Sequence, residues 1–284
     1  MILNYRYNTK VYFGMTFLVT YALWFVGAYL SHQDNKSGLY MVFMFLGLMT
    51  PFLISIVMIT TSKNSELKMD FINRLFNLRL IELKMLPAFL LIMPLSVLAS
   101  IALSLPFGGS ISQFQFAEGF SFSTGIVPVL LLLILAASLE ELGWRGYAFD
   151  SLQSRYNLFA ASIIFSVLWS LWHLPLIFVN NSYQYEVFHQ NIWFGVNFFV
   201  SIIPMGVIIS WICIKNRKSV IAAILFHFIV NMSQELLAMS QTTKCIETVV
   251  LTIVATVIVV LDKKMFFSTR GNSAWRNPPN SFRL

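Results

Sequence analysis

The chain has 284 residues, of which 57% are hydrophobic and only 11% are charged, and its formal net charge is +7. A soluble domain cannot bury that much apolar surface, because globular proteins usually contain about 25% charged residues. Windows of roughly 20 apolar residues recur along the whole length, so the composition predicts a polytopic membrane protein and excludes a soluble fold. Period-two alternation is missing, which favours an all-α helix bundle over a membrane barrel.

Eight apolar segments predict transmembrane helices. In chain order they are residues 11–31, 40–61, 85–106, 125–149, 157–179, 192–214, 218–240 and 246–262. The first follows a charged start, "MILNYRYNTK", but it is long and lacks a small-residue cleavage site, so we expect a retained span and not a signal peptide. No long polar linker or repeat divides the chain, and residues 1–264 are expected to form one helical membrane domain.

Two segments depart from the pattern of short loops. Residues 63–84 carry apolar and basic side chains at helical spacing, namely Leu67, Phe71, Leu75 and Leu78 interleaved with Lys68, Arg74 and Arg79. This pattern predicts a helix that either lies in the plane of the cytoplasmic headgroups or packs on the bundle as an ordinary loop helix. The tail 265–284 is polar, contains Pro278 and Pro279, and is expected to be disordered.

Basic residues are distributed very unevenly between the predicted loops. With eight spans, 17 of the 19 Lys and Arg residues fall on the side of the N-terminus, and only Lys36 and Lys244 fall on the other. Because cytoplasmic loops are enriched in Lys and Arg, both termini are predicted to be cytoplasmic. This orientation accounts for the net charge, so no nucleic-acid partner is implied. Cys213 and Cys245 fall near opposite membrane faces, and we expect no disulfide.

Ionisable side chains inside the predicted spans are few, and such groups usually face a bundle interior or a water-filled cavity. The fourth span contains Glu140, Glu141 and Arg145, the fifth contains His173, and the seventh contains His227 and Asn231. With a rise of ~1.5 Å per residue, Glu140 lies roughly 13 Å from the cytoplasmic end of its span, and the other groups fall in a similar band. Their occurrence at one depth on three helices predicts that they converge.

Helical spacing shows which of these side chains share a face. His227 and Asn231 are four residues apart and lie on one face, as do Trp169 and His173, so the indole can line the pocket beside the imidazole. A single intramembrane His or Asn is more often a helix–helix hydrogen-bonding group, and buried Trp is more often packing. The joint pattern, and not any one residue, indicates a site.

The two carboxylates are about 100° apart around their helix, so they cannot point at the same spot. We expect one of Glu140 and Glu141 to face the cavity and the other to face an internal partner, for which Arg145 is the available cation. The cluster is also compatible with a structural ion pair near the interface, in which Arg145 extends outward to the headgroups.

These residue types support two kinds of hydrolysis. A buried carboxylate can activate water, one histidine can hold that water or protonate a leaving amine, and a second histidine with an Asn amide can stabilise a tetrahedral oxyanion. Glu140, His173 and His227 also match the ligand set of a catalytic zinc site. The helical HExxH signature is absent, which weakens the zinc interpretation.

Three motifs occur in order along the chain: "EELGWR", "WSLWH" and "HFIVN". Together they resemble the EExxxR, aromatic-xxx-His and HxxxN motifs of the CAAX-protease and bacteriocin-processing family, over a core from about residue 125 to 235. The eight-span layout is most similar to archaeal members of its Ras-converting CAAX prenyl endopeptidase branch. The one departure is Trp169, where Phe is commoner in the family.

The resemblance implies an intramembrane endopeptidase that removes the last three residues from a prenylated CAAX protein or peptide. By motif position, Glu140 would activate water with help from His173, and His227 and Asn231 would form the oxyanion site. Glu141, Arg145 and Trp169 would support them. The family implies a glutamate mechanism without a cofactor, with zinc as the alternative. Because the substrate's lipid lies in the membrane, we expect a multi-pass protein whose site opens to the cytoplasm and to lipid.

Two other functional classes remain open at this stage. Some members of the family are membrane proteins that confer self-immunity or scaffold a partner, and they retain the motifs. A proton-coupled transporter also uses Glu and His chains inside the membrane, although transporters often show internal repeats, which this chain lacks.

Overall fold

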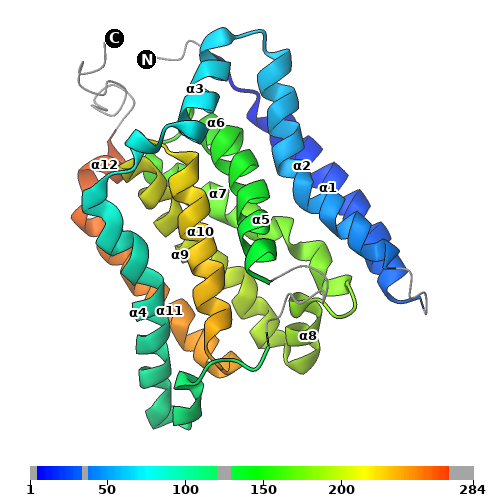
Figure 1. Cartoon of the computed structure of the whole chain (residues 1–284), viewed down its shortest axis with the longest axis vertical. Helices are drawn as coiled ribbons and strands as arrows, with labels where there is room; N and C mark the ends of the chain where they lie inside the picture. Colours follow the sequence, from blue (N-terminus) through cyan, green and yellow to red (C-terminus); the bar gives the residue numbers. More distant parts are fainter. Residues whose placement is uncertain (1–4, 34–37, 120–128, 269–284) are drawn as a thin grey trace.

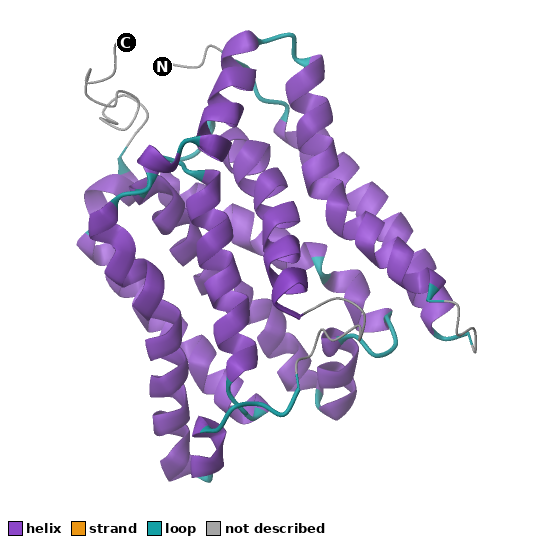
Figure 2. Cartoon of the chain, viewed as in Figure 1, coloured by secondary structure: helices purple, strands orange, loops and turns teal. Residues whose placement is uncertain are grey.

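The structure is a computed structural model that describes residues 5–33, 38–119 and 129–268. Over these residues the chain is built almost entirely of helices that run up and down side by side (Figures 1 and 2). The predicted all-α architecture is therefore confirmed.

The elements have the following bounds. The long helices are α1 (Thr9–Ser31), α2 (Leu39–Thr61), α4 (Leu86–Ser104), α5 (Val129–Gly143), α7 (Leu158–Trp172), α9 (Ile192–Lys215), α10 (Val220–Leu236) and α11 (Gln241–Leu261). The shorter helices are α3 (Ser65–Phe76), α6 (Phe149–Gln153), α8 (Tyr183–Gln190) and α12 (Lys263–Phe267). Single turns are η1 (Leu78–Leu80), η2 (Leu83–Met85), η3 (Leu105–Phe107), η4 (Ile111–Phe114), η6 (Leu174–Phe178) and the π-helical η5 (Trp144–Ala148).

Within the described residues, six helical segments are long and apolar enough to cross a membrane. They are Thr9–Ser31, Leu39–Thr61, Leu83–Phe107, Leu158–Phe178, Ile192–Lys215 and Gln241–Leu261. Each coincides with one of the eight predicted spans. The other two predicted spans correspond to α5 and α10, the helices that contain both glutamates, His227 and Asn231. α10 has only 17 residues, and the predicted start of the fourth span, 125–128, lies outside the described residues.

The two helices that carry most of the polar groups lie at the centre of the bundle. Figure 1 shows α5 and α10 in the middle, with α1 and α2 on one side and α4 and α11 on the other. α2 packs on α5, while α4 and α9 pack on α10. A helix enclosed by other helices presents little surface to lipid, so it can carry charged side chains at a lower desolvation cost.

A direct backbone contact joins α5 to α2. A Cβ added to Gly143 would lie only 2.4 Å from the carbonyl carbon of Pro51 and 2.6 Å from its oxygen. Tyr12 donates a hydrogen bond to that same carbonyl oxygen at 3.0 Å, and Ser55 of α2 donates to the carbonyl of Leu142 at 3.3 Å. The glycine of the "EELGWR" motif is therefore required by close helix packing.

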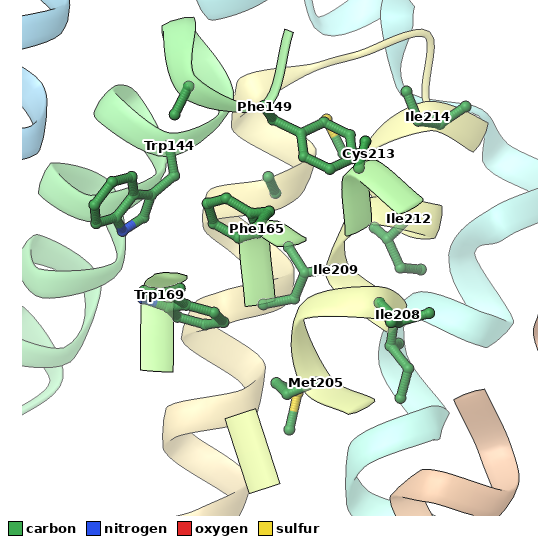
Figure 3. Packing of buried hydrophobic residues seen from close by; sticks show 14 of the residues in the cluster. Trp144, Phe149, Phe165, Trp169, Met205, Ile208, Ile209, Ile212, Cys213 and Ile214 are labelled. Atoms are coloured by element: carbon green, nitrogen blue, oxygen red, sulfur yellow. The ribbon is translucent and has the colours of Figure 1, made fainter. Parts of the chain in front are cut away.

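An aromatic ladder forms the core beside these helices. Figure 3 shows Phe149, Phe165 and Trp169 following one another next to the isoleucines of α9. The ring centroids of Phe149 and Phe165 are 5.8 Å apart, and those of Phe165 and Trp169 are 5.9 Å apart. The ladder fixes α6 against α7 and leads directly to the polar groups.

The segment predicted as an amphipathic helix packs on the bundle. In α3, Leu67 is fully buried and Phe71 is buried, so this helix packs on the bundle, and its position relative to the headgroups stays a prediction. The outer face instead exposes Met69, Ile72 and Phe76. Arg74, one of the basic residues interleaved in this segment, is buried, and its side chain is only 3% exposed.

α12 lies at the predicted boundary between the helical domain and the tail, residue 264. It extends to Phe267, and its Met265 and Phe266 are buried. The division of the chain into a domain 1–264 and a tail stays a prediction. Residues 269–284 of the predicted tail lie outside the described residues.

The contact between Gly143 and Pro51 generates a test of the packing. Gly143→Ala should lower stability by about 1–3 kcal/mol, because the new methyl group meets backbone atoms that cannot move aside. Gly14→Ala in α1 is the matched control, since a Cβ there meets nothing within 4 Å. Thermal unfolding of the purified protein in detergent measures both. Equal melting temperatures for the two variants would contradict the packing argument.

Candidate active site

Trp169 on α7 contacts three of the four candidate catalytic residues. Its indole Nε1 donates a hydrogen bond of 2.7 Å to Oε2 of Glu140, which is 6% exposed. Its backbone carbonyl accepts a bond of 2.8 Å from Nδ1 of His173. Its ring also meets the imidazole of His227 edge to face, with centroids 5.3 Å apart. The tryptophan expected to line the pocket therefore also forms hydrogen bonds with two candidate catalytic residues, through its indole and its backbone carbonyl.

His173 is the C-terminal cap of α7, where the chain turns into η6. A carbonyl oxygen can only accept, so Nδ1 of His173 carries the proton in its bond to the Trp169 carbonyl. In the neutral imidazole this leaves Nε2 unprotonated and able to accept a hydrogen bond. The rings of Trp172 and Phe198 hold the imidazole from two sides, at centroid distances of 4.8 and 5.7 Å.

Glu141 points away from Glu140, as the 100° offset predicts. It is fully buried, with Oε1 3.1 Å from Nδ1 of His227 and Oε2 3.5 Å from Nε of Arg145. Arg145 is the partner expected from the sequence. The contact with His227 is an addition that helical spacing does not predict, because it depends on how α5 and α10 are rotated against each other. The pair joins these two central helices through a charged contact.

The Arg145 side chain lies inside the protein and does not extend toward the headgroups. It is 1% exposed, and its guanidinium carbon lies 4.2 Å from the ring centroid of Phe165 and 5.2 Å from that of Phe149. Arg stacks well on aromatic faces because its planar cation is weakly hydrated. The aromatic ladder therefore supports the arginine that pairs with Glu141, and the alternative of an outward-extending Arg145 is wrong.

Asn231 lies one helical turn after His227 on α10 and is half-buried. The two side chains share a helix face, as four-residue spacing requires. α10 therefore presents an imidazole and an amide on one side.

The zinc alternative concerns how possible ligands are grouped among the described residues. No group of three or more His, Cys, Asp or Glu side chains among them is close enough together to hold a metal ion. Glu140, His173 and His227, the set suggested as zinc ligands, thus do not form such a group. Cys213 and Cys245 are both free.

Two charged residues that the sequence analysis did not select lie next to the site. Arg74 of α3 and Asp150 of α6 form a buried ion pair, with Nη1 and Oδ2 3.0 Å apart. Burial would raise the pKa of Asp150, but Arg74 and Lys218 together hold that pKa below its ordinary value. A signal for Arg74 was present, because it falls seven residues after Leu67 and three after Phe71, on the buried stripe of its helix.

Comparison with known proteins gives consistent matches. A family model described as "Type II CAAX prenyl endopeptidase Rce1-like" matches residues 122–233, which include all four candidate catalytic residues. The chain is 66% identical over 271 residues to CAAX prenyl protease 2 of Methanococcus maripaludis, covering 95% of this chain and 100% of that protein. It is 23% identical over 241 residues to lysostaphin resistance protein A of Staphylococcus haemolyticus, covering 82% of this chain and 62% of that protein.

The buried pair of Glu141 and Arg145 generates a second test. Arg145→Met keeps the packing on the aromatic rings but leaves a buried carboxylate without its cation, so we expect a loss of about 3–5 kcal/mol. The double variant Glu141→Gln/Arg145→Met removes both charges and keeps an acceptor for His227, so it should recover much of that loss. Unfolding curves in detergent compare the variants. If the double variant loses as much unfolding free energy as Glu141→Gln and Arg145→Met lose together, the two residues are not energetically coupled.

Proposed function

The chain belongs to the Rce1-like type II CAAX prenyl endopeptidase family and is an integral membrane protease, and from this premise we propose that it removes the -AAX tripeptide from prenylated CAAX proteins. Identity to a CAAX prenyl protease along that protein's whole length supports this substrate class. The observation that carries the proposal is the placement of Glu140 and His173, which come from different helices and are both hydrogen-bonded to Trp169.

In the proposed mechanism Glu140 is the general base. One of its carboxylate oxygens is occupied by the Trp169 indole, which leaves the other to take a proton from water. Nε2 of His173 accepts the second hydrogen of that water and so fixes its direction. The oxygen then attacks the carbonyl carbon of the prenylated cysteine and forms the new C–O bond.

His227 and Asn231 form the proposed oxyanion site. The Nδ1 of His227 faces the Glu141 carboxylate, which can only accept when ionised, so Nδ1 donates. Nε2 can then donate to the oxyanion only when the ring is an imidazolium, and the Asn231 amide supplies a second donor. Glu141 therefore has two tasks in this mechanism: it orients the ring and it favours the imidazolium form by a direct contact with Nδ1.

Collapse of the tetrahedral intermediate completes the reaction. The C–N bond after the cysteine breaks, and the proton that Glu140 took from water passes to the leaving amine. The products are a prenylated cysteine with a free carboxylate and a released tripeptide. Glu140 returns to its ionised form, so no protein group is consumed.

The distribution of basic residues supports access from the cytoplasm. The ends of α5 and α10 nearest to Glu140 and His227 lie on the side that holds most of the Lys and Arg residues, which is cytoplasmic by the positive-inside rule. The substrate's lipid and the membrane's own lipids are the proposed neighbours of this opening. A prenylated protein held in the cytoplasmic leaflet can then place its C-terminus below the headgroups.

Cleavage of a fluorogenic farnesylated CAAX peptide by the purified protein in liposomes tests the proposal. Glu140→Gln should lower kcat by about 10²–10⁴-fold, the usual contribution of a general base, while peptide binding is retained. A strong chelator should leave the wild-type rate unchanged. A peptide without the prenyl group serves as the substrate control.

Two outcomes would overturn this proposal. Cleavage that a chelator abolishes and zinc restores would favour the metal-dependent alternative. Well-folded wild type that cleaves no prenylated peptide would instead favour an immunity or scaffold role, such as the name of the 23% identical relative suggests for that protein.

The indole hydrogen bond generates a separate prediction. Trp169→Phe keeps an aromatic ring but removes the donor to Glu140, and we expect kcat to fall about 10-fold with little change in KM, since a hydrogen bond to a charged group contributes about 1.5–3 kcal/mol. Trp24→Phe is the control, because that indole donates to the carbonyl of Met44, at 2.9 Å, and not to a candidate catalytic group. Equal kcat values for the two variants would show that the indole donor does not matter.

A further inference from the structure

The π-helical turn η5 follows the two glutamates directly and contains Arg145. A π-helical turn is wider than an α-helical turn, because its backbone hydrogen bonds join residues five apart, and such turns occur frequently at functional sites. Two consecutive carbonyls of this turn are met by one side chain from another helix: Nη1 of Arg74 donates to the carbonyl of Arg145 at 3.1 Å, and Nη2 donates to that of Gly146 at 3.3 Å.

Arg74 is itself fixed in place by carboxylates. Its Nε lies 2.8 Å from Asp70, one turn earlier in α3, and its Nη1 lies 3.0 Å from Asp150 in α6. Asp150 also pairs with Lys218, at 2.8 Å, in the connection between α9 and α10. The guanidinium therefore contacts the carboxylates of Asp70 and Asp150, and its two Nη groups donate hydrogen bonds to the backbone of η5.

Close packing brings α3 onto the same turn. A Cβ added to Gly146 would lie 2.7 Å from Cε2 of Phe71, so the absence of a side chain at Gly146 lets the Phe71 ring lie on the η5 backbone. This contact and the two hydrogen bonds from Arg74 hold α3 against the backbone that carries Arg145. No other described helix supplies a side-chain cation to these carbonyls.

We propose that Arg74 is a positioning residue of the proteolytic site, which holds the π-helical turn so that Arg145 reaches Glu141 and Glu141 in turn orients His227. This inference rests on the proposed function. The contacts form an unbroken series, because Arg74 binds the Arg145 carbonyl, Arg145 pairs with Glu141 at 3.5 Å, and Glu141 contacts His227 at 3.1 Å.

The position of Arg74 lies outside the part of the chain that the family model matches, residues 122–233. It is also far from the catalytic motifs in sequence, and its side chain touches no candidate catalytic group. Its effect is therefore expected through geometry alone. A displacement of about 1 Å in a catalytic group can lower the rate about 10²-fold, so a shift of the turn is enough to matter.

Arg74→Met and Arg74→Lys in the full-length protein test the proposal, with Lys218→Met as the matched control. Arg74→Met should lower kcat for the farnesylated peptide about 10- to 100-fold with KM nearly unchanged, because the substrate-binding surface is intact. Arg74→Lys should restore part of kcat, since lysine keeps the charge but cannot bind two carbonyls side by side. Lys218→Met breaks only the half-exposed outer pair and should change kcat by no more than about twofold.

A second readout does not depend on activity. The ring ¹⁵N signals of His227, assigned by comparison with His227→Gln, should shift in Arg74→Met and stay unchanged in Lys218→Met. If the wild type proves inactive on prenylated peptides, this readout still decides the role of Arg74 while the proposed function fails separately. The inference would be overturned if folded Arg74→Met kept the wild-type kcat and unshifted His227 signals. It would also be overturned if Lys218→Met lost as much kcat as Arg74→Met. If Arg74→Met does not fold, Arg74→Lys is judged by the same two measurements.

Discussion

The buried pair of Glu141 and Arg145 is the interaction on which the rest of the site depends. Placing both charges in a membrane-embedded core is costly, and three contacts offset that cost: the ion pair itself at 3.5 Å, aromatic faces against the guanidinium, and an imidazole against the other carboxylate oxygen. The wide turn η5 places the arginine at the end of α5. Glu140, the neighbouring carboxylate, accepts a hydrogen bond from the Trp169 indole instead of pairing with Arg145, so two adjacent glutamates receive different environments.

The different environments of the two glutamates explain how one helix can supply both a base and a support. Glu141 is neutralised by a cation, whereas Glu140 has a neutral indole donor from Trp169. A neutral donor orients the Glu140 carboxylate without placing a full positive charge on the oxygen that it contacts. Phe, which is commoner in the family at this position, has no such donor. Trp169 therefore adds a hydrogen bond that the motif itself does not require.

Much of this arrangement could be predicted from the sequence. The all-α bundle and six of the eight spans follow from hydropathy, and the divergence of Glu140 and Glu141 follows from the 100° step of a helix. The contact between Glu141 and His227 could not be predicted, because it depends on the relative rotation of α5 and α10, which no local pattern encodes. The hydrogen bond from Trp169 to Glu140 depends in the same way on how α7 faces α5.

Arg74 is a different case, because the sequence shows its position on the apolar stripe of α3 but does not show the buried partners that its charge needs. A basic residue in a juxtamembrane helix normally extends to the headgroups, where it is hydrated. Here Asp70 and Asp150 supply the counter-charge inside the protein, and the π-helical turn supplies two carbonyls that accept hydrogen bonds from the guanidinium. A basic residue on the buried face of an amphipathic helix therefore indicates that other parts of the chain supply buried hydrogen-bond acceptors. In this protein those acceptors include the backbone carbonyls of the turn that holds Arg145.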